Sequence, residues 1–219
     1  MTTRPNRAAR PGSYHHGDLR RALIEAGTAL ARAGGPDAVV LREVTRQVGV
    51  TANAAYRHFA DRDALVAAVC SDAQTAVALT MEAELAEVEP SGDDGADACA
   101  HLRAVGAGYL RFAATEPGLF LTAFSVPDDL RRAASEDSAG DSGRTPFQLL
   151  AGALDEMVMA GVLAPERRPG AEFLAWSAVH GLAVLALGGP LSGLDRATLE
   201  RVGQRLLEMV DAGLQGPRP

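Results

Sequence analysis

The chain has 219 residues, of which 47% are hydrophobic and 22% charged, as in an ordinary soluble globular protein with a real core. Its net charge of −7 would argue against nucleic acid as a partner if the charge were evenly spread. However, residues 1–66 carry ten arginines and six acidic residues, whereas the remainder carries eleven arginines and twenty-two acidic residues. A basic N-terminal region followed by an acidic remainder is expected if only the N-terminal region contacts the phosphates of a nucleic acid.

Cysteine usage and apolar segments indicate a cytoplasmic protein. The two cysteines, Cys70 and Cys99, are interpreted as buried, reduced thiols. The first twenty residues are polar and arginine-rich, so we expect no secretory signal. Phe173–Leu194 has no charged side chain and is long enough to span a membrane. Because it contains His180 and Pro190 and is flanked by acidic residues, we expect a helix buried within protein instead.

The N-terminal segment predicts a basic arm followed by an amphipathic helix. Residues 1–13 place Arg4, Arg7 and Arg10 among proline, glycine and serine, a composition typical of a flexible segment. A helix is predicted over Asp18–Ala33, because apolar residues recur on one face at spacings of three and four. A Gly-Gly-Pro sequence ends this helix.

The run VTRQVGVTANAAYRHF (Val44–Phe59) predicts two short helices, over Arg42–Val48 and Ala52–His58, joined by a tight turn. Gly49 stands where the first helix must stop, and glycine adopts the left-handed conformation there without a Cβ clash. Thr51 is expected to cap the second helix by accepting a backbone N–H.

Each of these two helices has an apolar inward face and leaves other side chains outside. Residues four apart supply the inward faces: Val44 with Val48, and Ala55 with Phe59. A short helix with polar and aromatic residues outside suits the major groove of double-stranded DNA. The predicted DNA-contacting residues are Arg42, Thr51, Ala52, Asn53, Tyr56, Arg57, His58 and Arg62.

Different roles are predicted within this set. Asn53 and Thr51 are candidates for reading base edges, and a neighbouring alanine for contact with a thymine methyl. Tyr56 and His58 are expected at phosphates, and Arg62 is expected to grip a phosphate together with a helix N-terminus. The alternatives are core positions for Tyr56 and His58, and solvated surface positions for Asn53 and Arg62.

The rest of the chain predicts six further helices and no strand, so the expected fold class is all-α. Asp61 is expected to cap a helix that continues to about Glu89. Further helices are predicted over 98–115, 117–124, 146–160, 171–187 and 196–214. The segment 127–143 is rich in Asp, Ser, Arg and Gly and is predicted to be mobile. The last helix carries an apolar stripe that suits packing against a second copy of the chain: Leu199, Val202, Leu206, Leu207 and Val210.

The run GVTANAAYRHFADRDAL (Gly49–Leu65), preceded by an amphipathic helix, resembles the DNA-binding domain of the tetracycline-repressor (TetR) family. The resemblance covers about the first 70 residues. The family usually has Ile-Ala where this chain has Val44-Thr45, and lysine where Arg62 stands, which keeps the charge with a different geometry. YLRFAATEPGLF and WSAVHGL, at 109–120 and 176–182, resemble the C-terminal domain of a TetR subgroup marked by a Trp…His-Gly motif. Members of that subgroup often carry Tyr-His-His-Gly before the first helix, as 14–17 does here.

The resemblance implies a basic arm at 1–13, a helix-turn-helix domain at 14–62 and a helical ligand-binding and dimerisation domain at 63–215. It also implies a homodimer through the last two helices and a small-molecule pocket among the middle ones. Aromatic side chains with a few polar tips fit such a pocket. The candidate lining residues, each of which could instead belong to the core, are His101, Tyr109, Phe112, Phe120, Phe124, Phe147, Met157, Trp176 and His180.

These patterns favour a transcriptional regulator, in the first place a repressor that binds a palindromic operator as a dimer and is released by a small apolar molecule. Ligand binding would tilt the helix after Asp61 and move the recognition helices apart, which requires different affinities for two dimer states. The alternatives are an all-α enzyme or metal-binding bundle, and an interaction module without DNA binding. No nucleophile elbow, phosphate loop or zinc-like spacing is present, so no catalytic site, metal or cofactor is expected.

Overall fold

The computed structural model describes residues 16–126 and 135–215, and every α-helix or 3-10 turn in these ranges belongs to one all-α fold without strands. The expected fold class is therefore confirmed. The predicted arm at 1–13 lies outside the described residues. In chain order the α-helices are α1 (His16–Gly34), α2 (Leu41–Val48), α3 (Ala52–Ala55), α4 (Arg62–Ala86), α5 (Asp94–Thr115), α6 (Pro117–Ala123), α7 (Pro146–Met159), α8 (Ala171–Gly188) and α9 (Arg196–Gln215). The 3-10 turns are η1 (Pro36–Ala38), η3 (Glu136–Ser138) and η4 (Pro165–Arg167).

Three helix boundaries differ from the prediction by three or four residues. The helix α3 ends at Ala55 rather than at residue 58, although the chain continues in turns, with Tyr56 N donating to Ala52 O at 3.0 Å. The helix α5 begins four residues early, because the Asp93 carboxylate accepts the backbone N–H of Ala96 at 2.9 Å and caps it there. The helix α4 ends at residue 86, three residues before its predicted end.

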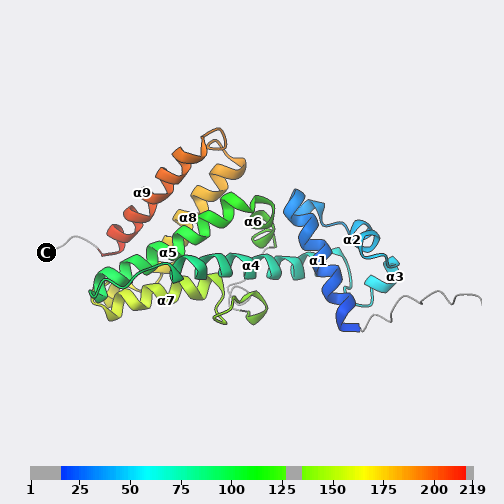
Figure 1. Ribbon diagram of the computed structural model, residues 1–219, viewed down its shortest axis with the longest axis horizontal. Coiled ribbons are helices and arrows are strands. Elements are labelled where there is room, and N and C mark those ends of the chain that lie inside the picture. The colour runs from blue at the N-terminus through cyan, green and yellow to red at the C-terminus, as the bar shows by residue number, and fades with distance from the viewer. Residues whose placement is uncertain (1–15, 127–134, 216–219) are drawn as a thin grey trace, which may run out of the picture.

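The helix α4 joins the two ends of the molecule (Figure 1). The helices α1, α2 and α3 form a small bundle at one end, and α4 runs from this bundle through the body. In the body, α5 packs against α4, α7, α8 and α9, while α6 packs against both α4 and α1. The short α6 is therefore a second bridge between the body and the N-terminal bundle.

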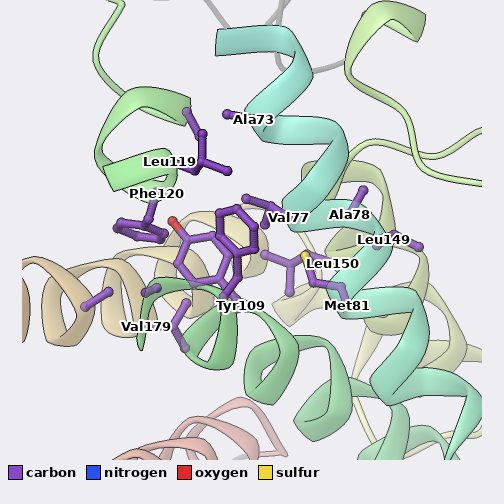
Figure 2. Close-up of a cluster of buried hydrophobic side chains, with 14 of the residues drawn as sticks. Ala73, Val77, Ala78, Met81, Tyr109, Leu119, Phe120, Leu149, Leu150 and Val179 are labelled. Atoms are coloured by element: carbon purple, nitrogen blue, oxygen red, sulfur yellow. The ribbon is translucent and has the colours of Figure 1, made fainter. Parts of the chain in front are cut away.

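The body is built around one apolar core (Figure 2). Side chains from α4, α5, α6, α7 and α8 converge on it, among them Val77, Tyr109, Phe120, Leu150 and Val179. The core continues into the N-terminal bundle, where Leu23 and Val44 are fully buried.

The segment predicted to be mobile is partly anchored. Of 127–143, residues 127–134 lie outside the described residues, but 135–143 are placed against α4. The Glu82 carboxylate accepts the backbone N–H of Asp141 at 3.0 Å and that of Ser142 at 3.1 Å. Its polar composition suggested solvent exposure, yet two of its backbone N–H groups and the Ser142 hydroxyl hold this part of the loop on Glu82.

The apolar stripe predicted on α9 does not face outward as a whole. Leu207 is buried, Leu206 packs against the core and Val210 faces the interior of the body. The exposed large apolar residues of this helix are Val202 and Met209, of which Met209 is 63% exposed. The prediction that the whole stripe faces a second copy is therefore wrong, because much of it packs on α5.

Two helices, α4 and α8, are long and apolar enough to cross a membrane by length and composition alone. Helix α4 is a core helix of the body. Helix α8 is less covered, with Phe173, Leu174, Val184 and Leu185 among its exposed residues. An exposed apolar helix face of this kind can be a protein–protein interaction surface as well as a membrane contact.

Candidate functional site

The turn between α2 and α3 has the geometry that its sequence predicts. Gly49 has a φ of 74° in the left-handed region, and its N–H points back to the carbonyls of Thr45 and Arg46. Thr51 then caps α3, since its hydroxyl oxygen accepts the backbone N–H of Ala54 at 3.3 Å. Both predicted roles are confirmed, and together they fix the direction in which α3 leaves the turn.

The inward and outward faces of the helix-turn-helix are separated as predicted. Val44, Ala55 and Phe59 are buried, and Val48 packs partly buried against the same core. The residues predicted to meet bases or phosphates and found exposed are Arg42, Thr51, Ala52, Asn53, Tyr56, Arg57 and Arg62. Tyr56 is 53% exposed, which excludes a core position for it, and His58 is half-buried.

Arg62 has bonds within the protein that its sequence did not reveal. Its guanidinium donates to Val39 O at 2.9 Å and to Pro36 O at 2.8 Å. These bonds tie the connection between α1 and α2 to the start of α4, where Asp61 caps the helix by accepting the N–H of Ala64 at 2.8 Å. The phosphate contact of Arg62 stays a prediction, and any substitution there also removes this support.

The body contains a cavity of about 460 Å³, a size typical of small-molecule sites. Its lining is mostly apolar and comes from α4 to α9 with the segments that follow α6. Of the nine predicted residues, five line it: Tyr109, Phe124, Phe147, Trp176 and His180. Among the lining residues that sequence analysis missed are Gln74 and Met81 on α4, Arg103 on α5, and Leu207 and Val210 on α9.

The other four predicted residues do not line this cavity, so the predicted set is corrected. His101 lies outside, where its Nδ1 is 2.8 Å from a carboxylate oxygen of Glu156. Phe112, Phe120 and Met157 are buried core residues. An aromatic or thioether side chain on an inward helix face can serve the core or a cavity equally, and its spacing does not distinguish the two.

Three lining residues form a chain of hydrogen bonds. The Trp176 indole N–H donates to the Tyr109 hydroxyl oxygen at 3.1 Å, and that oxygen is 2.7 Å from His180 Nδ1. Burial raises the pKa of the Tyr109 phenol, and burial lowers the pKa of His180. Both effects favour the uncharged form of each group. This series of hydrogen bonds therefore places an uncharged imidazole at the cavity wall.

Two further polar side chains of the lining are held by the protein. Arg103 on α5 forms a salt bridge with the buried carboxylate of Asp211 on α9. Gln74 on α4 donates its amide to Ala123 O at 2.9 Å, at the end of α6. Within 16–126 and 135–215, no three His, Cys, Asp or Glu side chains are grouped to hold a metal ion.

The cavity is connected to the N-terminal bundle through α4 and α6. Helix α4 carries Gln74 at the cavity and begins at Arg62, against the η1 connection. Helix α6 ends at the cavity and packs its start on α1, where Glu116 accepts from Arg32 Nε at 2.9 Å. A Cβ atom added at Gly118 would lie 2.4 Å from Ala31 O, so α6 and α1 approach as closely as glycine permits.

Two parts of the chain match known protein-family domains. Residues 23–69 match the bacterial regulatory proteins of the TetR family, over the helix-turn-helix. Residues 102–210 match the tetracyclin repressor-like C-terminal domain, over most of the cavity-forming body. No curated protein matches the chain.

Solved structures share the fold over nearly the whole chain. A Rhodococcus sp. RHA1 protein of unknown function is 26% identical, with a TM-score of 0.68 over 92% of this chain and 98% of that one. The TetR-family regulator PfmR from Thermus thermophilus is 19% identical, with a TM-score of 0.57 over 90% and 99%. A TetR variant from Acinetobacter baumannii AYE, solved with minocycline, is 16% identical, with a TM-score of 0.54 over 92% and 96%. With both domain matches and this shared fold, the chain belongs to the TetR family of transcriptional regulators.

Proposed function

We propose that this protein is a cytoplasmic, ligand-responsive repressor that binds a palindromic operator as a homodimer and releases it when a small molecule fills the cavity. The observation that carries the proposal is the position of α4. This one helix lines the cavity through Gln74 and Met81 and begins directly beside the helix-turn-helix. Any ligand that shifts α4 therefore acts on the DNA-binding end.

The proposed DNA contacts follow from the exposed face around α3. Asn53 is exposed and free of the core, so its amide can pair with an adenine edge in the major groove. Tyr56 and Arg57 lie exposed in the turn after α3, where they suit phosphates. Arg42 is exposed on α2 and is proposed to add a further phosphate contact.

The proposed dimer uses the exposed faces of α8 and α9. Leu174 on α8 and Met209 on α9 are 70% and 63% exposed, which is unusual for large apolar side chains on neighbouring helices. At Gly181 on α8 an added Cβ would meet nothing within 4 Å, so a helix of a second copy could approach closely there. Two such pairs form a four-helix interface, and the resulting two-fold symmetry matches two operator half-sites.

The proposed switch works through the two bridges from the cavity. A ligand between α4, α5 and α8 would be bound differently by two arrangements of α4 and α6, and it favours the one that it fits better. In the dimer, a tilt of α4 in each subunit changes the separation of the two α3 helices. Operator affinity and ligand affinity are then coupled reciprocally.

The test is a gel shift on DNA flanking the gene, with light-scattering mass measured on the same protein. The expected result is a dimer at micromolar concentration that shifts one palindromic fragment and leaves random DNA of equal length largely unshifted at the same salt. A protein that shifts neither fragment would support the alternative of an interaction module without DNA binding. A monomer that binds the operator fully would contradict the proposed interface.

A further inference from the structure

The donor and the acceptor of each hydrogen bond at the cavity wall can be deduced. Trp176 Nε1–H only donates, so it donates to the Tyr109 hydroxyl oxygen. Tyr109 is 4% exposed, and its ring lies in the apolar core that Figure 2 shows. Within the described parts of the chain, His180 Nδ1 is the acceptor within reach of the Tyr109 hydroxyl proton, at 2.7 Å between the heavy atoms.

This arrangement fixes the tautomer of His180. If Nδ1 carried a hydrogen, the Tyr109 oxygen would receive two donors, and its own proton would be left unpaired among the rings of Phe120 and Phe124. An unpaired buried donor is costly. Nδ1 is therefore the acceptor, and in the neutral imidazole the hydrogen resides on Nε2. Burial lowers the pKa of His180 and so favours this neutral form.

The Nε2–H group is available to a ligand. His180 is half-buried and lines the cavity. Among the residues that the structure describes, none accepts a hydrogen bond from Nε2, and this atom is not among the buried polar atoms without a partner. The Nε2–H group is therefore accessible, on a residue that lines the cavity, and the hydrogen bond from Tyr109 to Nδ1 fixes its hydrogen in place.

We propose that His180 Nε2–H anchors an uncharged aromatic ligand by donating a hydrogen bond to an acceptor on it, such as a ketone oxygen, and that Trp176 and Tyr109 are positioning residues that fix the imidazole. This inference rests on the proposed ligand-responsive function and names the class of ligand. The rings around His180 favour an aromatic body, since Phe124 and Trp176 lie 6.1 Å apart and Phe147 and Trp176 lie 6.2 Å apart, centre to centre.

The charges near the cavity disfavour an anionic ligand. Arg103 is the cationic side chain in the described lining, and the Asp211 carboxylate already pairs with it. A ligand carboxylate would have to displace the buried Asp211 or share the Arg103 guanidinium with it, which would bring two negative charges to one cation. An uncharged acceptor requires no such exchange and needs only the single donor that His180 supplies.

The first measurement uses Trp176, the one tryptophan of the chain, as a fluorescent reporter inside the cavity. Three probes of matched shape are titrated: benzophenone, which has a ketone, diphenylmethane, which lacks it, and diphenylacetate, which is an anion. One added hydrogen bond is expected to give benzophenone about a five-fold tighter binding than diphenylmethane. Diphenylacetate is expected to bind more weakly than either.

Variants assign this preference to His180. His180→Phe keeps an aromatic ring and is expected to bind benzophenone and diphenylmethane equally. The matched control is His101→Phe, since His101 pairs with Glu156 outside the cavity, and it should retain the five-fold preference. A loss of the preference in both variants would overturn the assignment to His180.

The positioning role of Tyr109 is tested by a spectroscopic signal that reports the hydrogen bond itself and does not depend on packing. Nitrogen-15 NMR of the imidazole separates the two tautomers, and His180 is assigned by its absence in His180→Phe. The wild type is expected to show hydrogen on Nε2 and a hydrogen-bonded Nδ1. In Tyr109→Phe the Nδ1 signal should lose its hydrogen-bond shift, and the pKa of His180 should rise. An unchanged imidazole spectrum would overturn the positioning role.

The ligand class is overturned if the wild type binds benzophenone and diphenylmethane equally, if diphenylacetate binds best, or if none of the three binds. Each of these outcomes is read without DNA. A failed gel shift with an intact benzophenone preference would therefore refute the repressor function and leave the anchor standing. A normal gel shift without that preference would support the repressor function and refute the proposed anchor.

Discussion

The DNA-binding end and the cavity place polar groups on opposite sides of their helices. Around α3, aliphatic side chains point inward, and Asn53, Tyr56 and Arg57 lie outside. Around the cavity, polar groups such as His180 lie among aromatic rings, and the Arg103 guanidinium is paired with the buried Asp211 carboxylate. An exposed basic surface gains affinity from charge and loses it in salt, whereas an enclosed apolar cavity gains affinity from the exclusion of water. The two sites should therefore respond to different perturbations, and they are connected through α4, α6 and the proposed dimer.

The largest expected effect comes from breaking the dimer, because this should remove operator binding and spare the cavity. The double substitution Leu174→Asp and Met209→Asp places charges on the proposed interface, where they would be buried unpaired. We expect monomers and a loss of at least about 4 kcal/mol in operator affinity, down to the non-specific level. Light-scattering mass and a gel shift measure this.

The matched control for this experiment carries the same two charges elsewhere. Leu79→Asp with Leu121→Asp alters exposed residues of α4 and α6 instead of α8 and α9, and should remain dimeric. Val210 is unsuitable for the purpose because it lines the cavity. A Leu174/Met209 variant that stays dimeric would show that the interface lies elsewhere.

A smaller effect is expected from disturbing the α6–α1 bridge. In Gly118→Ala the new methyl would lie 2.4 Å from Ala31 O, so the helices must move apart, at a cost of about 1–3 kcal/mol in the free energy of unfolding. Chemical denaturation measures the loss. Gly188→Ala is the control, because an added Cβ there meets nothing within 4 Å. Equal stability of the two variants would mean that the close approach at Gly118 carries no strain.

Asn53→Ala should affect only the DNA-binding end. We expect it to weaken specific operator binding by about 1–3 kcal/mol and to leave non-specific binding largely intact. Tyr56→Phe should instead weaken all sequences alike, as loss of a phosphate contact does. Competition gel shifts with operator and random DNA distinguish the two. An unchanged preference for operator in Asn53→Ala would remove its base-reading role.

The sequence predicted the N-terminal bundle better than the cavity, because the determinants of the bundle are local. Gly49, Thr51 and Asp61 act on backbone groups within a few residues of themselves, and their roles could be predicted from residue type and position. Arg62 shows the limit of such reasoning. Its partners, Pro36 O and Val39 O, are backbone atoms more than twenty residues away, which no local pattern reveals.

The cavity depends on contacts that are distant in sequence. Tyr109 and His180 are 71 positions apart and bond directly, and Arg103 and Asp211 are 108 positions apart. Aromatic type and an inward position selected Tyr109 and His180, which line the cavity, but also Phe112, which lies in the core. Whether an inward residue meets another side chain or an empty space depends on helix crossing geometry, which composition does not encode.

The smallest expected effect tests the buried imidazole through pH. His180 has a lowered pKa because it is desolvated, while in the unfolded chain its pKa is near 6.5. Below about pH 6.5 the unfolded state then binds more protons than the folded state, so the contribution of His180 to stability is complete above that pH and is lost as the pH falls toward its folded pKa. The slope is at most about 1.4 kcal/mol per pH unit, the value for one proton. The measurement is the free energy of unfolding of wild type minus that of His180→Phe between pH 5 and 8, because other titrating groups cancel in the difference. A difference that stays flat across this range would show that the imidazole is not desolvated, whereas one that grows at low pH would show that it gains a proton on folding.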